Sequence, residues 1–201
     1  MTLLQWVIAS LAIGTGAALQ GSIGFGMALV ASPILVMVDP RFIPEPYMLS
    51  ALILSISMVR RERGSVDLNG VKWAIVGRIP ATVLAGWLLV VVPQDIMVLV
   101  FGVIVLVAVA ISASGVRFPP VRSNLIGAGF LAGLMGTIAT IGGPPMAIVY
   151  QESDSPTLRS TLSAYFIFGG LFSLITLFAY GRVGWPDFFL ALALSPGIIL
   201  G

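Results

Sequence analysis

Two glycine-rich stretches are the parts of this sequence best suited to bind a ligand. They read GSIGFG at residues 21–26 and GTIATIGGPP at residues 136–145, and each interrupts a long apolar run. A helix that restarts after such an interruption presents unpaired backbone N–H groups and the positive end of its dipole, which together attract anions. Glycine also lets a ligand approach the backbone closely. We therefore predict one two-part anion site. The residues predicted to bind the substrate are Gln20, Gly21, Ser22, Gly24, Gly26, Gly136, Thr137, Thr140, Gly142, Gly143 and Arg159.

Polar side chains near these stretches add hydrogen-bond donors to the predicted site. Ser22, Thr137 and Thr140 carry hydroxyl groups, and Gln20 stands at the end of the first apolar run. Arg159 lies near the start of a later span, from which it could reach the second stretch or simply anchor a loop. The competing interpretation is that the glycines permit close helix packing and that the hydroxyls bond carbonyls of the preceding turn. Packing does not require two interrupted segments, so their pairing favours a site.

Several kinds of chemistry are excluded by composition. The chain contains no cysteine and no histidine, which rules out disulfides, Ser-His-Asp triads and metal sites with thiolate or imidazole ligands. The glycine order G-x-x-G-x-G differs from the G-x-G-x-x-G of dinucleotide-binding loops, and no strand precedes it. We therefore expect no enzyme activity, no catalytic residue, no bound metal and no cofactor.

The elements that position these stretches are expected to be membrane helices. Hydrophobic residues make up 58% of the chain and charged residues 9%, whereas soluble domains carry about 25% charge. A bilayer core takes about 20 apolar residues per helix, so we predict an all-α, polytopic transmembrane helical bundle. The expected spans are 2–19, 47–59, 71–92, 96–115 and 162–180, and the shorter segments 27–38 and 141–150 are expected to be half-helices. The first span lacks a basic flank, which favours a retained helix over a cleaved signal peptide.

Basic residues predict the orientation of the bundle. Arginine and lysine gather in the loops 60–72 and 116–122. Two predicted spans, 71–92 and 96–115, connect these loops, and the turn PQD between the spans carries an acid and no base. Cytoplasmic loops are enriched in such residues. We therefore expect a multi-pass protein of the inner cell membrane with both basic loops in the cytoplasm.

Charged residues outside these loops have two interpretations each. We expect Arg78 to extend along its helix to the membrane interface, the alternative being a gate or a counter-charge to the substrate. We expect Glu45, Glu152 and Asp154 to be exposed loop acids, the alternative being proton carriers for coupled transport.

An internal repeat links the two glycine-rich stretches. GSI at 21–23 recurs as GTI at 136–138, which is 115 residues later, and other glycines and prolines recur at nearly the same offset. We divide the single membrane domain into repeat one, 1–118, and repeat two, 119–201, and expect the second repeat to be incomplete at its C-terminus. The charge pattern agrees equally well with interrupted segments that cross the membrane and with interrupted segments that fold back. Parallel and inverted repeats are therefore both open.

The paired motifs resemble those of the TauE/SafE family of membrane exporters. The stretches that carry the resemblance are GSIGFGMALVASPIL at 21–35, PEPYMLSAL at 44–52 running into RRERGSVDL, and GLMGTIATIGGPPMAIVYQ at 133–151. The resemblance implies about eight helices in two repeats. It also implies transport of small anions, chiefly sulfite or organosulfur compounds, driven by the proton gradient.

We therefore expect a secondary transporter that exports a small anion bound between the two stretches. The alternatives are an exporter of divalent metal cations, which would use carbonyl groups and acids, and a membrane scaffold that transports nothing. The expected partners are the small anion and the lipid bilayer, with no nucleic acid. A homodimer is compatible with all of these hypotheses.

Overall fold

The computed structural model describes residues 3–200, and every regular element in that range is a helix. The α-helices are α1 (Leu3–Ile23), α2 (Met27–Val38), α3 (Glu45–Arg61), α4 (Leu68–Val91), α5 (Gln94–Ala113), α6 (Arg122–Ala139), α7 (Gly143–Tyr150), α8 (Ser155–Ala179) and α9 (Trp185–Leu200). Two short 3-10 helices, η1 (Pro40–Phe42) and η2 (Arg63–Ser65), lie in connections. The predicted all-helical class is confirmed, and α2 begins and ends at the predicted residues.

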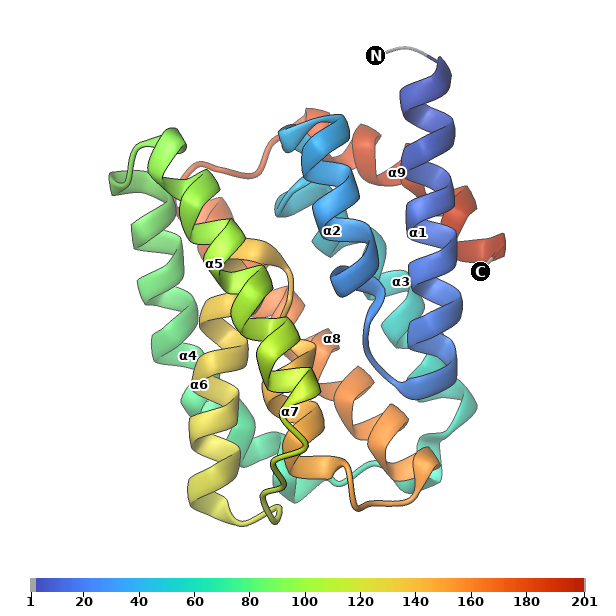
Figure 1. Ribbon diagram of the computed structural model, residues 1–201, viewed down its shortest axis with the longest axis vertical. Coiled ribbons are helices and arrows are strands. Elements are labelled where there is room, and N and C mark those ends of the chain that lie inside the picture. The colour runs from blue at the N-terminus through green and yellow to red at the C-terminus, as the bar shows by residue number, and fades with distance from the viewer. Residues whose placement is uncertain (1–2, 201) are drawn as a thin grey trace.

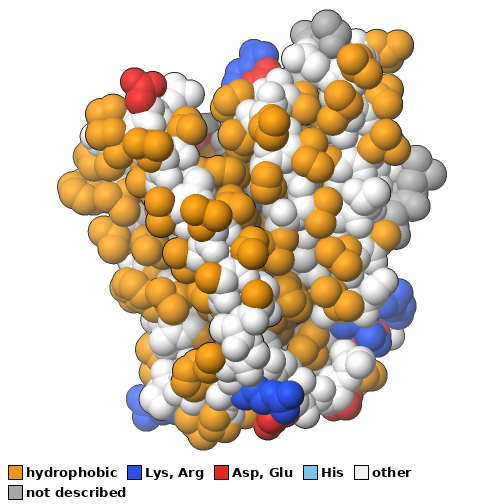
Figure 2. Space-filling model, in the orientation of Figure 1, with side chains coloured by type: hydrophobic (Ala, Val, Ile, Leu, Met, Phe, Trp, Pro, Cys, Tyr) orange, Lys and Arg blue, Asp and Glu red, His pale blue; other side chains and the backbone are white. Residues whose placement is uncertain are grey.

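The surface of the bundle is suited to lipid. Among the described helices, α1, α4, α5 and α8 are long and apolar enough to span a membrane, and α2 is a shorter apolar helix. Figure 2 shows hydrophobic side chains covering the flank of the molecule, whereas the charged side chains visible on this face gather toward its two ends. On α5, large apolar side chains such as Leu99 and Leu106 are exposed on the outside of the bundle. This apolar surface and the long apolar helices indicate a multi-pass membrane protein.

Apart from the two glycine-rich interruptions, the connections between helices lie at two opposite ends of the bundle (Figure 1). At the lower end, the ion pair between Arg159 and Glu62 joins the start of α8 to the residue that follows α3. At the upper end, the pair between Arg182 and Glu45 joins the connection after α8 to the start of α3. Helices α3 and α8 are therefore antiparallel neighbours that are tied together at both ends.

Glycines bring the backbones of α4 and α6 into direct contact. A Cβ at Gly77 would overlap the carbonyl oxygen of Ile126, and a Cβ at Gly129 would overlap that of Ala74. These positions use glycine for close helix packing. The tight α4–α6 pair is the platform on which α8 packs, and α1 packs against α2 and α9 on the other side of the bundle.

Two predictions about charged residues are wrong. Arg78 does not extend to the membrane interface, since its side chain packs between its own helix, α4, and the neighbouring helices α6 and α8, and is only 5% exposed. The side chain fits there because Gly133 and Gly169 leave room for it. Glu45 is not an exposed loop acid, since it is buried beside Arg182 as the first residue of α3. The carboxylates of Glu152 and Asp154 are exposed, as predicted.

Candidate functional site

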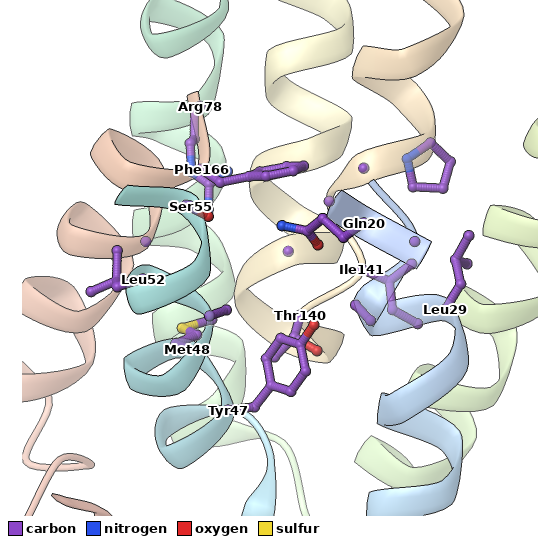
Figure 3. A pocket seen from close by; sticks show the side chains of 18 residues that line it. Gln20, Leu29, Tyr47, Met48, Leu52, Ser55, Arg78, Thr140, Ile141 and Phe166 are labelled. Carbon is purple, nitrogen blue, oxygen red and sulfur yellow. The ribbon is translucent and has the colours of Figure 1, made fainter. Parts of the chain in front are cut away.

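The two glycine-rich stretches meet inside the bundle. A Cβ at Gly143, in the second stretch, would lie 2.9 Å from the side chain of Phe25 in the first. The hydroxyl oxygens of Ser32 on α2 and Thr140 in the second stretch are 2.6 Å apart and share a hydrogen bond. Both stretches line one cavity, in which Figure 3 shows Gln20 lying between Phe166 and Tyr47.

The first stretch turns the chain from α1 into α2 through two glycines. Gly24 and Gly26 have φ angles of 92° and 112°, a region that side chains with a Cβ rarely adopt. Gly24 has a second constraint, because a Cβ there would lie 2.9 Å from the Cα of Arg159. Helix α2 then begins inside the protein, with Gly26 as its N-cap. Its first turn leaves backbone N–H groups without intrahelical partners, and Ala28 and Leu29 of that turn line the cavity.

The second stretch offers fewer backbone donors than the first. Thr140 has a φ angle of 64°, which is uncommon for a residue other than glycine, and its hydroxyl bonds Ser32. Helix α7 begins at Gly143, and the next two residues, Pro144 and Pro145, have no backbone N–H. Gly142 packs against its own hairpin, because a Cβ there would lie 2.7 Å from the carbonyl oxygen of Ala132. The backbone donors at this site therefore come mainly from α2.

The cavity has a volume of about 70 Å³. A cavity of about 10–15 Å³ suffices for one water molecule, so this one admits a ligand of a few heavy atoms. Its lining comes from α1, α2, α3, α4, α6, α7 and α8 and from the two interruptions. The lining residues are Gln20, Gly26, Ala28, Leu29, Tyr47, Met48, Ala51, Leu52, Ser55, Arg78, Gly136, Thr140, Ile141, Gly142, Gly143, Pro144, Phe166 and Gly170. Within this set Arg78 carries a positive charge and no residue carries a negative one.

Six residues that the sequence nominated line this cavity. They are Gln20, Gly26, Gly136, Thr140, Gly142 and Gly143. They come from three separate helices and both interruptions, so the fold brings together most of the residues named from the two stretches.

The other five nominated residues lie outside the cavity lining. Gly21 and Ser22 lie at the lower end of α1, where the Ser22 hydroxyl donates to the carbonyl oxygen of Ala18. Gly24 packs against Arg159, which pairs with Glu62 at 2.6 Å and therefore lies beside the first stretch, not the second. Thr137 lies behind the cavity and is described with Arg78 below.

Arg78 is the cavity residue that sequence reasoning placed elsewhere. Its Nη2 donates to the hydroxyl of Ser173 at 3.2 Å, and its guanidinium carbon lies 4.9 Å from the centre of the Tyr165 ring. The Ser173 hydroxyl in turn shares a hydrogen bond of 2.9 Å with Thr137, which donates to Thr82 at 3.4 Å. An arginine in the middle of an apolar span was the signal available in the sequence.

Polar contacts at the lower end join the end of α7 to the start of α4 and cap α8. Tyr150, the last residue of α7, donates to Asp67 at 2.9 Å, and Asp67 also caps α4 by accepting from the Gly70 N–H. Hydrogen bonds from Thr157 to Asp154 cap α8 and keep the pKa of Asp154 below its ordinary value. The termini of α4, α7 and α8 are therefore fixed close to one another.

A further ion pair lies at the upper end. The Arg41 guanidinium donates hydrogen bonds to the carboxylate of Asp39, with a closest distance of 2.6 Å, and this hydrogen bonding lowers the pKa of Asp39. Nowhere in residues 3–200 do three or more acidic side chains gather as a metal site would require. The arrangement as a whole is suited to a small anion, because the cavity offers N–H groups, hydroxyls and a guanidinium.

Comparison with known proteins identifies the group to which this chain is similar. A family model described as "Sulfite exporter TauE/SafE" matches residues 8–201, which is nearly the whole chain. No curated protein and no solved structure matches the chain significantly.

Proposed function

Since the chain belongs to the TauE/SafE sulfite exporter family, we propose that it is a secondary transporter that exports a small anion by way of the cavity between its two glycine-rich stretches. The family assignment supports membrane transport of a sulfur anion as the class of activity. Sulfite and small organosulfur or organic anions are the proposed substrates. Their size agrees with a cavity of about 70 Å³.

One observation carries the proposal: both interruptions open onto the same cavity. The first turn of α2, Thr140 and Arg78 all line it. Backbone N–H groups at a helix start bind anions through their partial positive charge. A cation would find no carboxylate among the lining residues, so this site favours anion export over metal export.

The helix arrangement supports two inverted repeats, of which the first contains α1–α5 and the second α6–α9. In each, a long helix (α1 or α6) is followed by a glycine-rich interruption and a shorter helix (α2 or α7) that packs back against it. Helix α1 starts at the upper end and α6 at the lower end, so the two units run in opposite directions (Figure 1). The contacts correspond too, because α4 packs on α6 and α8 as α9 packs on α1 and α3. Inverted repeats with interrupted helices are typical of secondary transporters.

We propose that the lower end faces the cytoplasm. The basic loops 60–72 and 116–122 both lie there, and Arg159 adds a further positive charge. This follows the tendency of cytoplasmic loops to be basic. The chain has no cysteine, so single cysteines introduced by Arg41→Cys and Glu152→Cys give an unambiguous test. A membrane-impermeant maleimide should label position 41 from outside the cell and position 152 only in inverted vesicles. Labelling of both from the same side would contradict the inverted arrangement.

Proton coupling is part of the proposal, with Glu45 as the candidate carrier. Of the three acids nominated from the sequence, Glu45 is the buried one, whereas Glu152 and Asp154 are exposed. A buried carboxylate that can exchange a cation partner for a proton is what coupled transport requires.

Flux through proteoliposomes tests the function directly. Purified protein would be reconstituted with sulfite inside the vesicles, and efflux would be followed with and without an imposed proton gradient. We expect efflux of sulfite well above that from protein-free vesicles, and none of Zn²⁺ or Mn²⁺. If none of sulfite, sulfoacetate and related small anions moves or binds, the chain is not an anion transporter, and metal export or a scaffold role takes its place.

A further inference from the structure

We propose that Arg78 selects the substrate by holding an oxyanion on its guanidinium group. This inference rests on the proposed function, because it assigns the charge that the anion site uses and the chemical class it accepts. The class is a small anion with a compact XO₃-type head, such as sulfite or a short sulfonate, whose two oxygens match the fork of an arginine.

The first argument is that Arg78 has no counter-ion in the protein. Among residues 3–200, no carboxylate lies within ion-pair distance of it, whereas every other ion pair in that range joins an arginine to an acid nearer the ends of the bundle. Its one hydrogen bond goes from Nη2 to the Ser173 hydroxyl, and its Nε has no partner. The side chain is only 5% exposed.

Such an arrangement is unfavourable unless a ligand completes it. Burying an ionised group without a partner costs several kcal/mol. An anion in the cavity supplies both the missing charge and acceptors for the free N–H groups.

The second argument is that the surrounding helices are shaped to receive this side chain. A Cβ at Gly169 would overlap the guanidinium, and a Cβ at Gly133 would lie 2.9 Å from the Arg78 Cγ. The Tyr165 ring lies under the guanidinium, and Nη2 donates to the hydroxyl of Ser173, which is itself hydrogen-bonded to Thr137. Two helices of the second proposed repeat, α6 and α8, therefore surround an arginine that comes from α4 of the first repeat and lines the cavity.

The third argument is the space in front of the guanidinium. Gly136 lines the cavity, and a Cβ built on it would lie 3.5 Å from Nη2, which is an ordinary contact distance. The glycine leaves this side of the guanidinium uncovered. A methyl group at position 136 therefore fits the fold but occupies the space beside the arginine.

These features separate a binding role from a purely structural one. A structural arginine would stabilise the protein whether or not an anion is present. An arginine whose counter-ion is the bound substrate should destabilise the protein when no anion is bound. Its removal should abolish the stabilisation that the anion gives.

The test is a thermal-melting and binding experiment on the full chain in detergent. The probes are sodium sulfite, sodium sulfate and sodium chloride at matched ionic strength, and the variants are Arg78→Met, Arg78→Lys and Arg60→Met. Arg60 is an exposed arginine on α3 and serves as the matched control. We expect sulfite to raise the melting temperature of the wild type and of Arg60→Met by the same amount. Chloride should have little effect, because a single spherical ion cannot occupy both arms of the fork.

For Arg78→Met we expect a melting temperature without anion at or above that of the wild type, and sulfite affinity reduced by about tenfold to a hundredfold. Arg78→Lys should retain part of the affinity. If Arg78→Met binds sulfite as tightly as the wild type, the inference is overturned and the proposed function stands. If the wild type neither binds nor transports any oxyanion, the proposed function itself fails.

A second variant, Gly136→Ala, tests whether the anion binds at Arg78 if Arg78→Met does not fold. Gly136→Ala retains the arginine and should fold well, because alanine is a better helix former than glycine. We expect its sulfite affinity to fall at least severalfold while its melting temperature stays equal or rises. Gly127→Ala is the matched control, since Gly127 lies in the same helix with open space around it. Wild-type affinity in Gly136→Ala would place the anion elsewhere and overturn the inference.

Discussion

The hydroxyl oxygens of Ser32 and Thr140 lie 2.6 Å apart, although 108 residues separate them in the sequence. Ser32 is fully buried on α2, and Thr140 stands in the interruption between α6 and α7 with a left-handed backbone. This contact ties the first half-helix to the second interruption next to the cavity. The geometry of each proposed half-site therefore depends on the other.

Removing this hydrogen bond should loosen the junction. We expect Ser32→Ala to lower the free energy of unfolding by about 1 kcal/mol, because a buried hydroxyl loses its partner. A double-mutant cycle with Thr140→Ala, measured by denaturant titration in micelles, should give a coupling energy of similar size. Thr140→Ser keeps the hydroxyl and is the control. Additive effects of the two alanine substitutions would mean that the contact contributes nothing to stability.

Two glycines nominated as places of ligand approach should behave differently from each other. A Cβ at Gly142 would lie 2.7 Å from the carbonyl oxygen of Ala132, whereas a Cβ at Gly21 meets nothing within 4 Å. We expect Gly142→Ala to cost about 1–3 kcal/mol of stability through overpacking. Gly21→Ala should leave stability unchanged or raise it by up to about 1 kcal/mol, as expected for a helical position.

Melting curves of the two variants in detergent, compared with the wild type, check this prediction. Equal melting temperatures would mean that the α6–α7 hairpin yields easily at Gly142. Because the substitution disturbs packing first, loss of transport in a bulkier variant such as Gly142→Val would not by itself place a ligand there.

The helices could be predicted from the sequence because each depends on a local property. A long apolar run predicts a span, and glycine followed by a fresh apolar run predicts where a helix restarts, as at Met27. The position of Arg78 could not be predicted in this way. Its burial depends on room left by Gly133 and Gly169, which belong to helices remote in sequence. Glu45 was missed for the same reason, since its partner Arg182 lies 137 residues away.

The lining of the cavity could be predicted from the sequence only in part. Six residues of its lining could be named from the two glycine-rich stretches and the adjacent Gln20, since both stretches are recognisable motifs. Most of the other lining residues come from α3, α4 and α8, and they include Tyr47 and Phe166. These residues look like ordinary parts of apolar helices, and only the packing of the whole bundle turns them toward the cavity.

The hydroxyl of Tyr150 should stabilise the second half-helix. It donates to Asp67 at 2.9 Å and so joins the end of α7 to the cap of α4. We expect Tyr150→Phe to lower the free energy of unfolding by about 1 kcal/mol, since a hydrogen bond to a partly buried carboxylate is lost. Denaturant titration measures the change. Tyr180→Phe is a suitable control because Tyr180 is exposed at the upper end, and an equal loss in both variants would contradict the prediction.

Glu45 should link transport to the proton gradient. Its Oε1 lies 3.2 Å from Nε of Arg182, and its side chain is only 7% exposed. Glu45 and Arg182 line a second cavity, at the upper end of the bundle, and the other charged residues that line it are Arg41 and Asp187. Protonation of Glu45 would remove the charge that holds Arg182, and so release one of the two ion pairs that tie α3 to α8. Binding and loss of a proton at Glu45 would therefore change how firmly the upper ends of these helices are joined.

We accordingly expect Glu45→Gln, which resembles the protonated acid, to transport sulfite at a rate that no longer responds to an imposed pH gradient. Flux in proteoliposomes, measured with and without the gradient, gives the answer. Glu152→Gln is the matched control, because Glu152 is 69% exposed and pairs with Arg117 at the lower end. It should keep the full response. If Glu45→Gln is accelerated by the gradient as strongly as the wild type, the proton travels by another group. The upper ion pair would then be a structural tie only, like the pair between Arg159 and Glu62 at the opposite end of α3.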